Sequence, residues 1–504
     1  PLPRLDSHRK AALSPLDLVV IALYLGTTLG VGALVSRNQR TAADYFLGAR
    51  DLPGWAILLS IVATETSALT VISVPAVAAR GDLTFLQLPL GYLIGRLAVA
   101  AWLLPGYFAG EQETAYARLE SRFGPITRRF TSVIFMATRA MGDGVRIYAS
   151  AIPLAVLAGW DVPLSILVMS AVTLLYTWHG GLKAVVWVDV VQLVIYLLGG
   201  VVALYLATGL AGGVDAMFAS AEAAGRLKLI DLSLDLGRPY TLLGGLIGGA
   251  MLSAASHGTD QLIVQRLLAS RNLRDARFAL IGSGIVVLAQ FALFLMIGVA
   301  LAAAGRAPAD LPADQIFSSF IVQEMPAGLA GLMLAAIMAA AMSTQASAIN
   351  ALASSVTHDL YASWTGRRDP LHLFRVGRVA SLGWGVLVTG VALAFDATAG
   401  GGQTPVVVFA LSIASITYGA LLGAYLLAGG PRRIGGRDVI TGIMIGLTCM
   451  LIVFFGKSLA AAGGPDWMAT AGRLAWPWYV PLGTLVTTTT GYLSSLRPAR
   501  GGPA

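Results

Sequence analysis

The chain is poor in the residues that form disulfides, metal centres and catalytic sites. Its 504 residues include a single cysteine, Cys449, and five histidines. One cysteine excludes a disulfide framework or a thiolate metal site within the chain. The histidines lack zinc-ligand spacing, and the sequence has neither a GxxxxGK[ST] nucleotide-binding motif nor a convincing Ser-His-Asp order. We therefore expect neither an enzyme nor an organic cofactor.

Charged residues are also scarce, at 12%, whereas 56% of the chain is hydrophobic. A soluble domain carries about 25% charged residues, so this composition predicts an integral membrane protein. About 20 consecutive apolar residues cross a bilayer as a helix. On that basis we predict an all-α protein with about 13 spans: 14–36, 53–79, 83–109, 127–159, 161–178, 183–211, 239–258, 275–305, 326–361, 371–398, 403–428, 437–456 and 475–496.

Basic residues are divided unequally between the two sets of loops. One set, with the C-terminal tail, holds 21 Lys and Arg, the other set holds ten, and three of the 34 lie inside spans. The positive-inside rule then places the N-terminal tail 1–13 outside the cell membrane and the C-terminal tail 497–504 in the cytoplasm. The net charge of +8 follows from this bias and is no evidence for nucleic acid. The basic set comprises 36–52, 110–129, 179–183, 266–277, 362–378 and 429–437.

The spans fall into two candidate repeats, each of five helices. The first covers 53–211 and the second 239–428, with one extra helix at 14–36 and two C-terminal helices within 437–496. An odd number of spans in each half would invert the second unit relative to the first, as in inverted-repeat transporters. Two external segments, 212–238 and 306–325, have room for short surface helices.

The span at 53–79 contains a polar centre that predicts a helix break. Its residues Ala63-Thr64-Glu65-Thr66-Ser67 place an acid and three hydroxyls near the membrane midplane. Unwound backbone at that depth survives only where it lines a cavity, and its carbonyls can then coordinate a cation. The alternative is a continuous helix whose hydroxyls bond back to the preceding turn. Glu65 favours the break, because an intramembrane carboxylate is costly and indicates a functional site by default.

A second polar feature lies in the span at 326–361. Ala340, Ser343, Thr344 and Ser347 follow at i, i+3, i+4 and i+7, so they share one helix face. We call these four residues the hydroxyl stripe. Small residues and hydroxyls can pack membrane helices together, and they can equally supply oxygens to a small hard cation. The stripe alone leaves both functions open.

Other intramembrane charges carry two interpretations each. Asp189 can cap a helix or pair with an arginine, or it can compensate the charge of a partly dehydrated Na⁺. Arg139, Asp143 and Arg146 share one helix face, so Asp143 can neutralise one arginine and leave one net positive charge. That guanidinium suits a substrate carboxylate, although a structural triad is an equal alternative. Arg96 is a further buried cation.

Glu65 is one candidate partner for Arg96. The histidines His179 and His257 are expected to be interfacial or core hydrogen-bonding groups rather than ligands. Tryptophans near the predicted span ends are typical of interfacial belts. These are Trp55, Trp160, Trp178, Trp187, Trp476 and Trp478.

Several segments, taken together and in order, resemble the sodium–solute symporter family, which includes sodium-coupled sialic acid, proline and galactose transporters. The matching stretches cover most of the chain: DYFLGARDLPGWAILLSIVATETSALT (44–70), LESRFGPITRR (119–129), GGLKAVVWVDVVQ (180–192), GTDQLIVQRLLASR (258–271), MSTQASAINALASSVTHDLY (342–361) and FALSIASITYGALLGA (409–424). The resemblance implies a leucine-transporter-type core of two inverted five-helix repeats.

The resemblance also implies particular binding residues. The sodium site would comprise the backbone carbonyls of Ala63, Thr66 and Ala340 with the hydroxyls of Ser343 and Thr344. A second sodium would use Asp189, Ser343 and Ser347, although Ala346 replaces one hydroxyl of that site. The expected substrate residues are Thr64, Glu65, Ser67, Thr70, Phe85, Gln87 and Arg139. Glu65 fits an anionic substrate poorly unless it pairs with an arginine, binds a proton or second cation, or meets a cationic or zwitterionic solute.

The sequence thus predicts a Na⁺-coupled symporter that imports a small polar organic solute by alternating access. Sodium is the only metal expected, and the solute and the lipid bilayer are the expected partners, with no obligatory protein partner. Two alternatives stay open. One is a proton-coupled symporter that uses Glu65 or Asp189, and the other is a transporter-like sensor.

Overall fold

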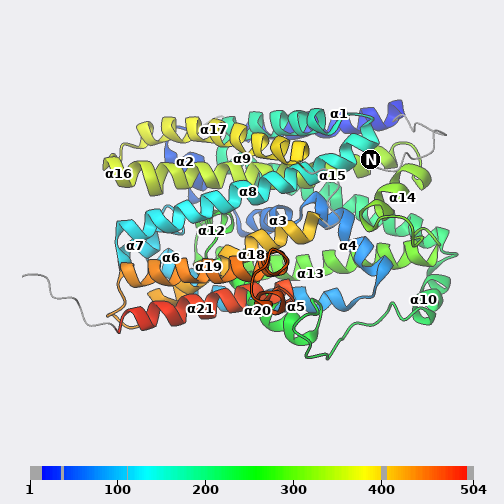
Figure 1. Cartoon of the computed structure of the whole chain (residues 1–504). Coiled ribbons are helices and arrows are strands. Elements are labelled where there is room, and N and C mark those ends of the chain that lie inside the picture. The colour runs from blue at the N-terminus through cyan, green and yellow to red at the C-terminus, as the bar shows by residue number, and fades with distance from the viewer. Residues whose placement is uncertain (1–13, 36–38, 111, 399–405, 497–504) are drawn as a thin grey trace, which may run out of the picture.

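The computed structural model describes residues 14–35, 39–110, 112–398 and 406–496, so the predicted tails 1–13 and 497–504 lie outside the described residues. Throughout these ranges the regular structure is helical, and the long helices run side by side in one bundle (Figure 1). The long helices are α1 Pro15–Val35, α3 Gly54–Glu65, α4 Ala68–Arg80, α5 Gln87–Ala98, α8 Pro125–Ala158, α9 Val162–Leu210, α11 Gly249–Gly258, α13 Leu273–Ala303, α15 Leu329–Ser355, α17 Pro370–Thr398, α18 Val406–Ala428, α19 Gly436–Ala461 and α21 Tyr479–Ser494.

Shorter helices connect them. π-helical segments extend three of the long helices, at Val99–Leu103 after α5, Gly244–Gly248 before α11 and Val356–Ala362 after α15. The short α-helices are α2 Ala42–Leu47, α6 Leu104–Phe108, α7 Ala117–Phe123, α10 Val214–Ala223, α12 Gln261–Leu268, α14 Ile316–Glu324, α16 Ser363–Thr365 and α20 Asp466–Ala471. The predicted surface helices in 212–238 and 306–325 are present as α10 and α14.

Seven helices in the described part of the chain are long and apolar enough to cross a bilayer, and an eighth is added if the bent pair α3 and α4 is one span. This confirms the membrane class. The predicted span 127–159 is helical as α8 but is not among the seven, and it carries charged residues at mid-length.

Residues 161–211 form a more continuous element than the sequence predicted. The expected loop 179–183 is wrong, because α9 is interrupted only at Gly181, with φ 50° and ψ −155°. Its 49 residues would extend about 74 Å as one straight rod, more than twice the hydrocarbon thickness of a bilayer, and Gly181 interrupts the helix near the middle. Only glycine fits there, since an added Cβ would lie 2.4 Å from the carbonyl oxygen of Tyr45.

The break predicted in span 53–79 is confirmed. Helices α3 and α4 are bent by 63° relative to one another, and Thr66 and Ser67 are extended, with ψ of 102° and 163°. The helical hydrogen bonds stop at Thr66 N–H to Val62 O (3.1 Å) and resume at Thr70 N–H to Ser67 O (2.9 Å). The carbonyls of residues 63–66 are therefore released from the helical ladder.

Helix α15 forms the centre of the bundle. Of its most apolar stretch, 94% of the residues are buried, and the helix packs against α1, α8 and α9. Alanines and serines fill it, and small residues let neighbouring membrane helices approach closely. The hydroxyl stripe lies in this buried helix.

The two ends of the bundle carry different short helices. Helices α10 and α14 lie at one end, and α7 and α16 lie at the other (Figure 1). We call these the α10 end and the α7 end. Segments that the sequence assigned to the same side of the membrane therefore lie at the same end of the bundle.

Candidate functional site

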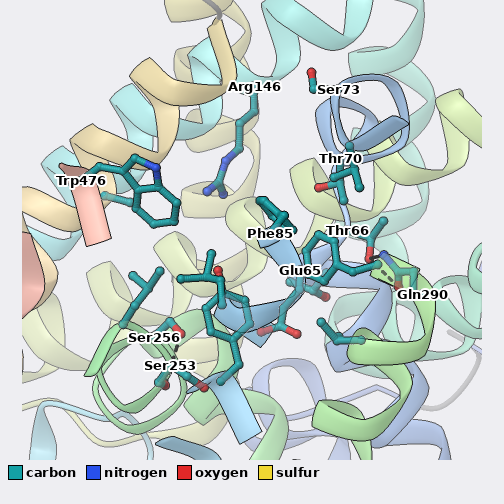
Figure 2. Close-up of a pocket in the computed structure, with 18 of the residues that line it drawn as sticks. Glu65, Thr66, Thr70, Ser73, Phe85, Arg146, Ser253, Ser256, Gln290 and Trp476 are labelled. Carbon is teal, nitrogen blue, oxygen red and sulfur yellow. Dashed lines mark hydrogen bonds between the residues drawn. The ribbon is translucent and has the colours of Figure 1, made fainter. Parts of the chain in front are cut away.

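A cavity of about 370 Å³ lies beside the break between α3 and α4 and extends toward the α10 end. At that end its wall includes Arg80 and Ala313. Aromatic side chains line much of the remaining wall: Phe85, Tyr92, Tyr240, Phe291, Tyr418 and Trp476. Figure 2 shows Thr66, Thr70, Ser73, Ser253 and Ser256 around the same space.

A buried ionic network joins the helices at the α7 end. The carboxylate of Asp359 accepts hydrogen bonds from Thr114 (2.5 Å), Arg128 Nε (2.7 Å) and Ser132 (3.0 Å). Arg128 also pairs with Glu120, at 2.6 Å. This network ties α8 to the end of α15, whereas the cavity extends toward the opposite end.

Glu65 lies in the cavity wall as one member of an ion-paired cluster, which we call the Glu65 cluster. Its Oε2 is 2.5 Å from the guanidinium of Arg96, and its Oε1 is 2.6 Å from His257 Nε2. The Arg96 side chain is fully buried, and that of Glu65 is 21% exposed. The pairing of Arg96 with Glu65 is confirmed. His257 is a buried hydrogen-bonding group, as expected, but no sequence feature indicated that it would lie against the second oxygen of Glu65.

The charges of α8 form a second cluster, the Arg139 cluster. Arg139 Nε lies 2.7 Å from Asp143, and Arg139 also donates to Asp260 at 3.3 Å. Arg146 donates to the same Asp143 at 3.1 Å. The predicted net positive charge was wrong, because Asp260 adds a second carboxylate and makes these four groups neutral overall. Arg146 points into the cavity in Figure 2, and Arg139 also lines the cavity.

Asp260 was missed because it falls between the predicted span 239–258 and the predicted loop 266–277, where no element was expected. The sequence placed 266–277 among the basic surface loops, yet every residue of α12 is buried, Arg266 included. Asp260 caps this helix by accepting from Leu262 N–H at 2.8 Å. An eight-residue helix folded into the bundle leaves no apolar run long enough to be recognised in the sequence.

Arg266 lies among the residues predicted for a second sodium. Its guanidinium donates to Asp189 at 3.1 Å and also to Ser347, and both Arg266 and Asp189 have fully buried side chains. Asp189 accepts further hydrogen bonds from Ser60 (2.5 Å) and Ser343 (2.6 Å). The three residues predicted for a second sodium therefore lie close together, but the cation among them is the guanidinium of Arg266.

The hydroxyl stripe faces the end of α3. The hydroxyl of Thr64 lies 3.2 Å from that of Ser347, one turn beyond Ser343. Ala340, Ser343 and Thr344 are all buried, and Thr344 donates back to the Ala340 carbonyl at 3.1 Å. The structure thus brings the end of α3, where the helical hydrogen bonds stop, beside a buried face of hydroxyls, and oxygen ligands are the kind that hard cations prefer.

The predicted substrate residues divide into two groups. Thr64, Glu65, Thr70, Phe85 and Arg139 line the cavity, whereas Ser67 and Gln87 do not. The Gln87 amide donates to the carbonyls of Thr84 and Tyr240, both at 3.0 Å, and so supports the wall from behind.

Two side chains of the cavity wall were not expected from the sequence. Gln290 on α13 hydrogen-bonds the Thr66 hydroxyl within 3.0 Å and holds the helix break in place (Figure 2). Trp476 was predicted in an interfacial belt, which is wrong, because it is 7% exposed and lines the cavity. The sequence around Gln290 and Trp476 contains no feature that indicates a cavity.

Comparison with known proteins identifies the family of this chain. The model of the sodium:solute symporter family matches residues 45–446. The chain belongs to the sodium:solute symporter family. The family resemblance predicted from the sequence segments is therefore confirmed. The human sodium/iodide cotransporter is 30% identical over 461 residues, covering 88% of this chain and 70% of that protein.

Sialic acid symporters of the family are also similar to the chain. The sodium/sialic acid symporter of Proteus mirabilis (strain HI4320) is 28% identical over 467 residues, covering 88% of this chain and 90% of its own. A solved structure of a sodium-coupled sialic acid symporter in a substrate-bound outward-open state matches with a TM-score of 0.83 and 25% identity. That match covers 95% of this chain and 97% of the other.

Proposed function

We propose that this member of the family moves Na⁺ and a small organic solute into the cell by alternating access. One observation carries the proposal. The broken helix α3–α4 faces the buried hydroxyl stripe of α15 and also forms the wall of a cavity that extends toward the α10 end. A single element thus borders both an ion site and a solute site.

The sodium ligands in this proposal are the carbonyls of Ala63, Thr66 and Ala340 with the hydroxyls of Ser343 and Thr344. The helix break releases the α3 carbonyls, and rotation of the Thr344 hydroxyl releases the carbonyl of Ala340. A cation held between α3 and α15 would stabilise the arrangement in which the cavity is open. Because binding is reciprocal, solute would raise sodium affinity by the same factor as sodium raises solute affinity.

The orientation in this proposal follows the basic loops. The α7 end carries the loops rich in arginine, so it faces the cytoplasm, with the N-terminus outside and the C-terminus inside. The cavity then extends outward. About 13 spans, with inverted repeats at 53–211 and 239–428, would give the two halves the opposite orientations that alternating access needs. Inward opening would require the Asp359 network to separate.

Proton coupling is the weaker alternative. It needs Glu65 or Asp189 to exchange a proton, yet each carboxylate is ion-paired with a fully buried arginine, Arg96 or Arg266. Protonation would leave that arginine buried and uncompensated, which is costly.

Sodium binding can be tested on the purified protein. Ligands that bind the folded state stabilise it by mass action, so the melting temperature should rise with NaCl and not with choline chloride at equal ionic strength. The rise should saturate, and Thr344→Ala should require more sodium. Equal melting temperatures in both salts would contradict the sodium site.

A further inference from the structure

We propose that Arg146 holds a carboxylate of the transported solute, and that the solute is a small monocarboxylate with a flat apolar body. This inference rests on the proposed symport function and narrows its substrate class. It also moves the anion contact from Arg139, where the sequence placed it, to the arginine two helical turns along α8.

Arg139 and Arg146 differ in how many carboxylates they pair with. Arg139 is 9% exposed and is bound on two sides, by Asp143 and by Asp260, whose carboxylate also accepts from Tyr418 at 2.6 Å. Arg146 is 18% exposed, and among the described residues Asp143 is its one ion-pair partner. A guanidinium has five N–H donors in a planar fork, so Arg146 retains donors for a second, bidentate carboxylate.

The remaining charges of the cavity favour a single carboxylate. Both oxygens of Glu65 are paired, while Asp143 and Asp260 are at most 2% exposed, so the acids present little charge to the cavity. Arg80, at the α10 end, donates to the backbone carbonyls of Ala307, Pro308 and Leu311. Arg146 is therefore the cation best placed to receive an anion inside the cavity, and a second carboxylate on the solute would meet no matching partner.

The wall near Arg146 indicates the body of the solute. Phe85 packs edge-on against Tyr240 at 5.1 Å and lies 5.2 Å from Phe291, and all three rings line the cavity. Figure 2 shows the guanidinium of Arg146 directed into the space that Phe85 and Trp476 border. Aromatic walls favour flat apolar groups, so a ring or short chain attached to one carboxylate fits this site better than a polyhydroxylated body.

Phenylacetate and phenylacetamide are matched probes, because they share a flat body and differ in charge. Binding to the full-length protein would be measured by calorimetry in NaCl, with sialic acid as a carboxylate on a polar body. We expect phenylacetate to bind and phenylacetamide to bind at least tenfold more weakly. Arg146→Gln should weaken phenylacetate binding about tenfold to a hundredfold, and Arg146→Lys should weaken it less.

The matched control is Arg306→Gln, the same change at an exposed arginine outside the cavity wall, which should leave phenylacetate affinity unchanged. Arg146→Gln should keep the sodium-induced rise in melting temperature, which shows that it folds. Equal binding of acid and amide, an unchanged Arg146→Gln variant, or tighter binding of sialic acid would overturn the inference. Loss of the sodium effect in the wild-type protein would instead overturn the proposed symport function.

A separate observation concerns the number of sodium ions. We infer that Arg266 is a built-in cation that takes the place of a second sodium at Asp189, so that one Na⁺ accompanies each solute. Every nitrogen of the guanidinium donates a hydrogen bond. Nε donates to the Ser60 hydroxyl (2.8 Å), one terminal nitrogen donates to the Leu262 carbonyl (2.9 Å), and the other donates to Asp189 and Ser347. Its charge already balances Asp189, and a sodium ion there would have to displace a fully buried ion pair.

Sodium titrations of melting temperature and of solute binding test this inference. The wild-type protein and Asp189→Asn should both show a Hill coefficient near 1. Arg266→Met should need sodium to reach wild-type stability and should move the coefficient toward 2, because the uncompensated Asp189 would then attract an ion. The double variant Asp189→Asn/Arg266→Met should lose that extra sodium dependence.

A wild-type coefficient near 2 that falls to 1 in Asp189→Asn would show that sodium binds at Asp189 despite Arg266, and would overturn the inference. That comparison does not depend on the folding of Arg266→Met. If Arg266→Met folds but responds to sodium as the wild-type protein does, the inference is also wrong.

Discussion

The Glu65 cluster and the Arg139 cluster border the same cavity and use the same chemistry, yet they differ in completeness. In the Glu65 cluster a buried arginine and a histidine engage both oxygens of one acid. In the Arg139 cluster the acids and arginines alternate, and the last member, Arg146, is exposed to the cavity. Charge inside a membrane protein can therefore be structural or available to a ligand, and its pairing decides which.

Breaking the complete cluster should have the largest effect. Arg96→Met leaves Glu65 with His257 alone and should destabilise the protein by about 3–5 kcal/mol, the typical loss when one partner of a buried pair is removed. Adding Glu65→Gln should restore much of that stability, and the double variant should still bind sodium, because the proposed ion site does not include Glu65. Melting temperatures in detergent would show whether the single variant is the less stable one. Equal stability of single and double variants would contradict the pairing.

Arg139→Lys addresses the inner member of the second cluster. Lysine cannot span Asp143 and Asp260 with one planar fork, so we expect a loss of stability of about 1–3 kcal/mol. Phenylacetate affinity should change less than threefold in the protein that remains folded. A tenfold weaker affinity with an unchanged melting temperature would return the carboxylate contact to Arg139.

Thr344→Ala tests the proposed sodium site, which, unlike the two clusters, contains no charged side chain. Removing one of its oxygen ligands should raise the half-saturating sodium concentration about tenfold, equivalent to about 1.4 kcal/mol. Thr448→Ala is a matched control, since Thr448 donates to the Met444 carbonyl on an exposed face of α19 in the same way. Ser343→Ala is less clean, because Ser343 also donates to Asp189. The two threonine variants should differ in sodium affinity and not in folded yield.

The smallest effect is expected at Glu113, outside the spans. Contact with His358, at 2.9 Å, holds the pKa of Glu113 below its usual value of 4.5, although the side chain is 47% exposed. A lowered pKa stabilises the folded state above pH 4.5 and loses this effect as the pH falls through the folded-state pKa. Glu113→Gln should therefore cost less than about 1 kcal/mol at neutral pH. Melting curves of the variant and the wild-type protein should converge in acid.

Local sequence features predicted the parts of the site that lie on one helix. The polar run from Ala63 to Ser67 indicated the break, and helical spacing indicated the stripe of Ala340, Ser343 and Thr344, because both signals are contained within a single span. The partner of Arg96 was also foreseen, since few acids lie at membrane depth.

The parts that depend on tertiary folding were not predictable in this way. Arg266 belongs to α12 and Asp260 caps it, and charges of this kind are typical of a loop until the helix is folded into the bundle. Because the prediction did not include them, it assigned one net positive charge to the group of Arg139, Asp143 and Arg146. It also named no arginine as the partner of Asp189. The pairing of His257 with Glu65 and the burial of Trp476 in the cavity wall were not foreseen for the same reason, because both arise only from packing between distant helices.

Solute accumulation in proteoliposomes tests the central claim most directly. With phenylacetate as solute, an inward sodium gradient should drive uptake above equilibrium, and a pH gradient in sodium-free buffer should drive no more uptake than it does in protein-free liposomes, which the neutral acid enters unaided. The same reconstituted protein provides both measurements, so poor reconstitution cannot account for a difference between them. Accumulation on the pH gradient alone, without sodium and above that of protein-free liposomes, would contradict sodium coupling and restore Glu65 or Asp189 as the site of proton transfer.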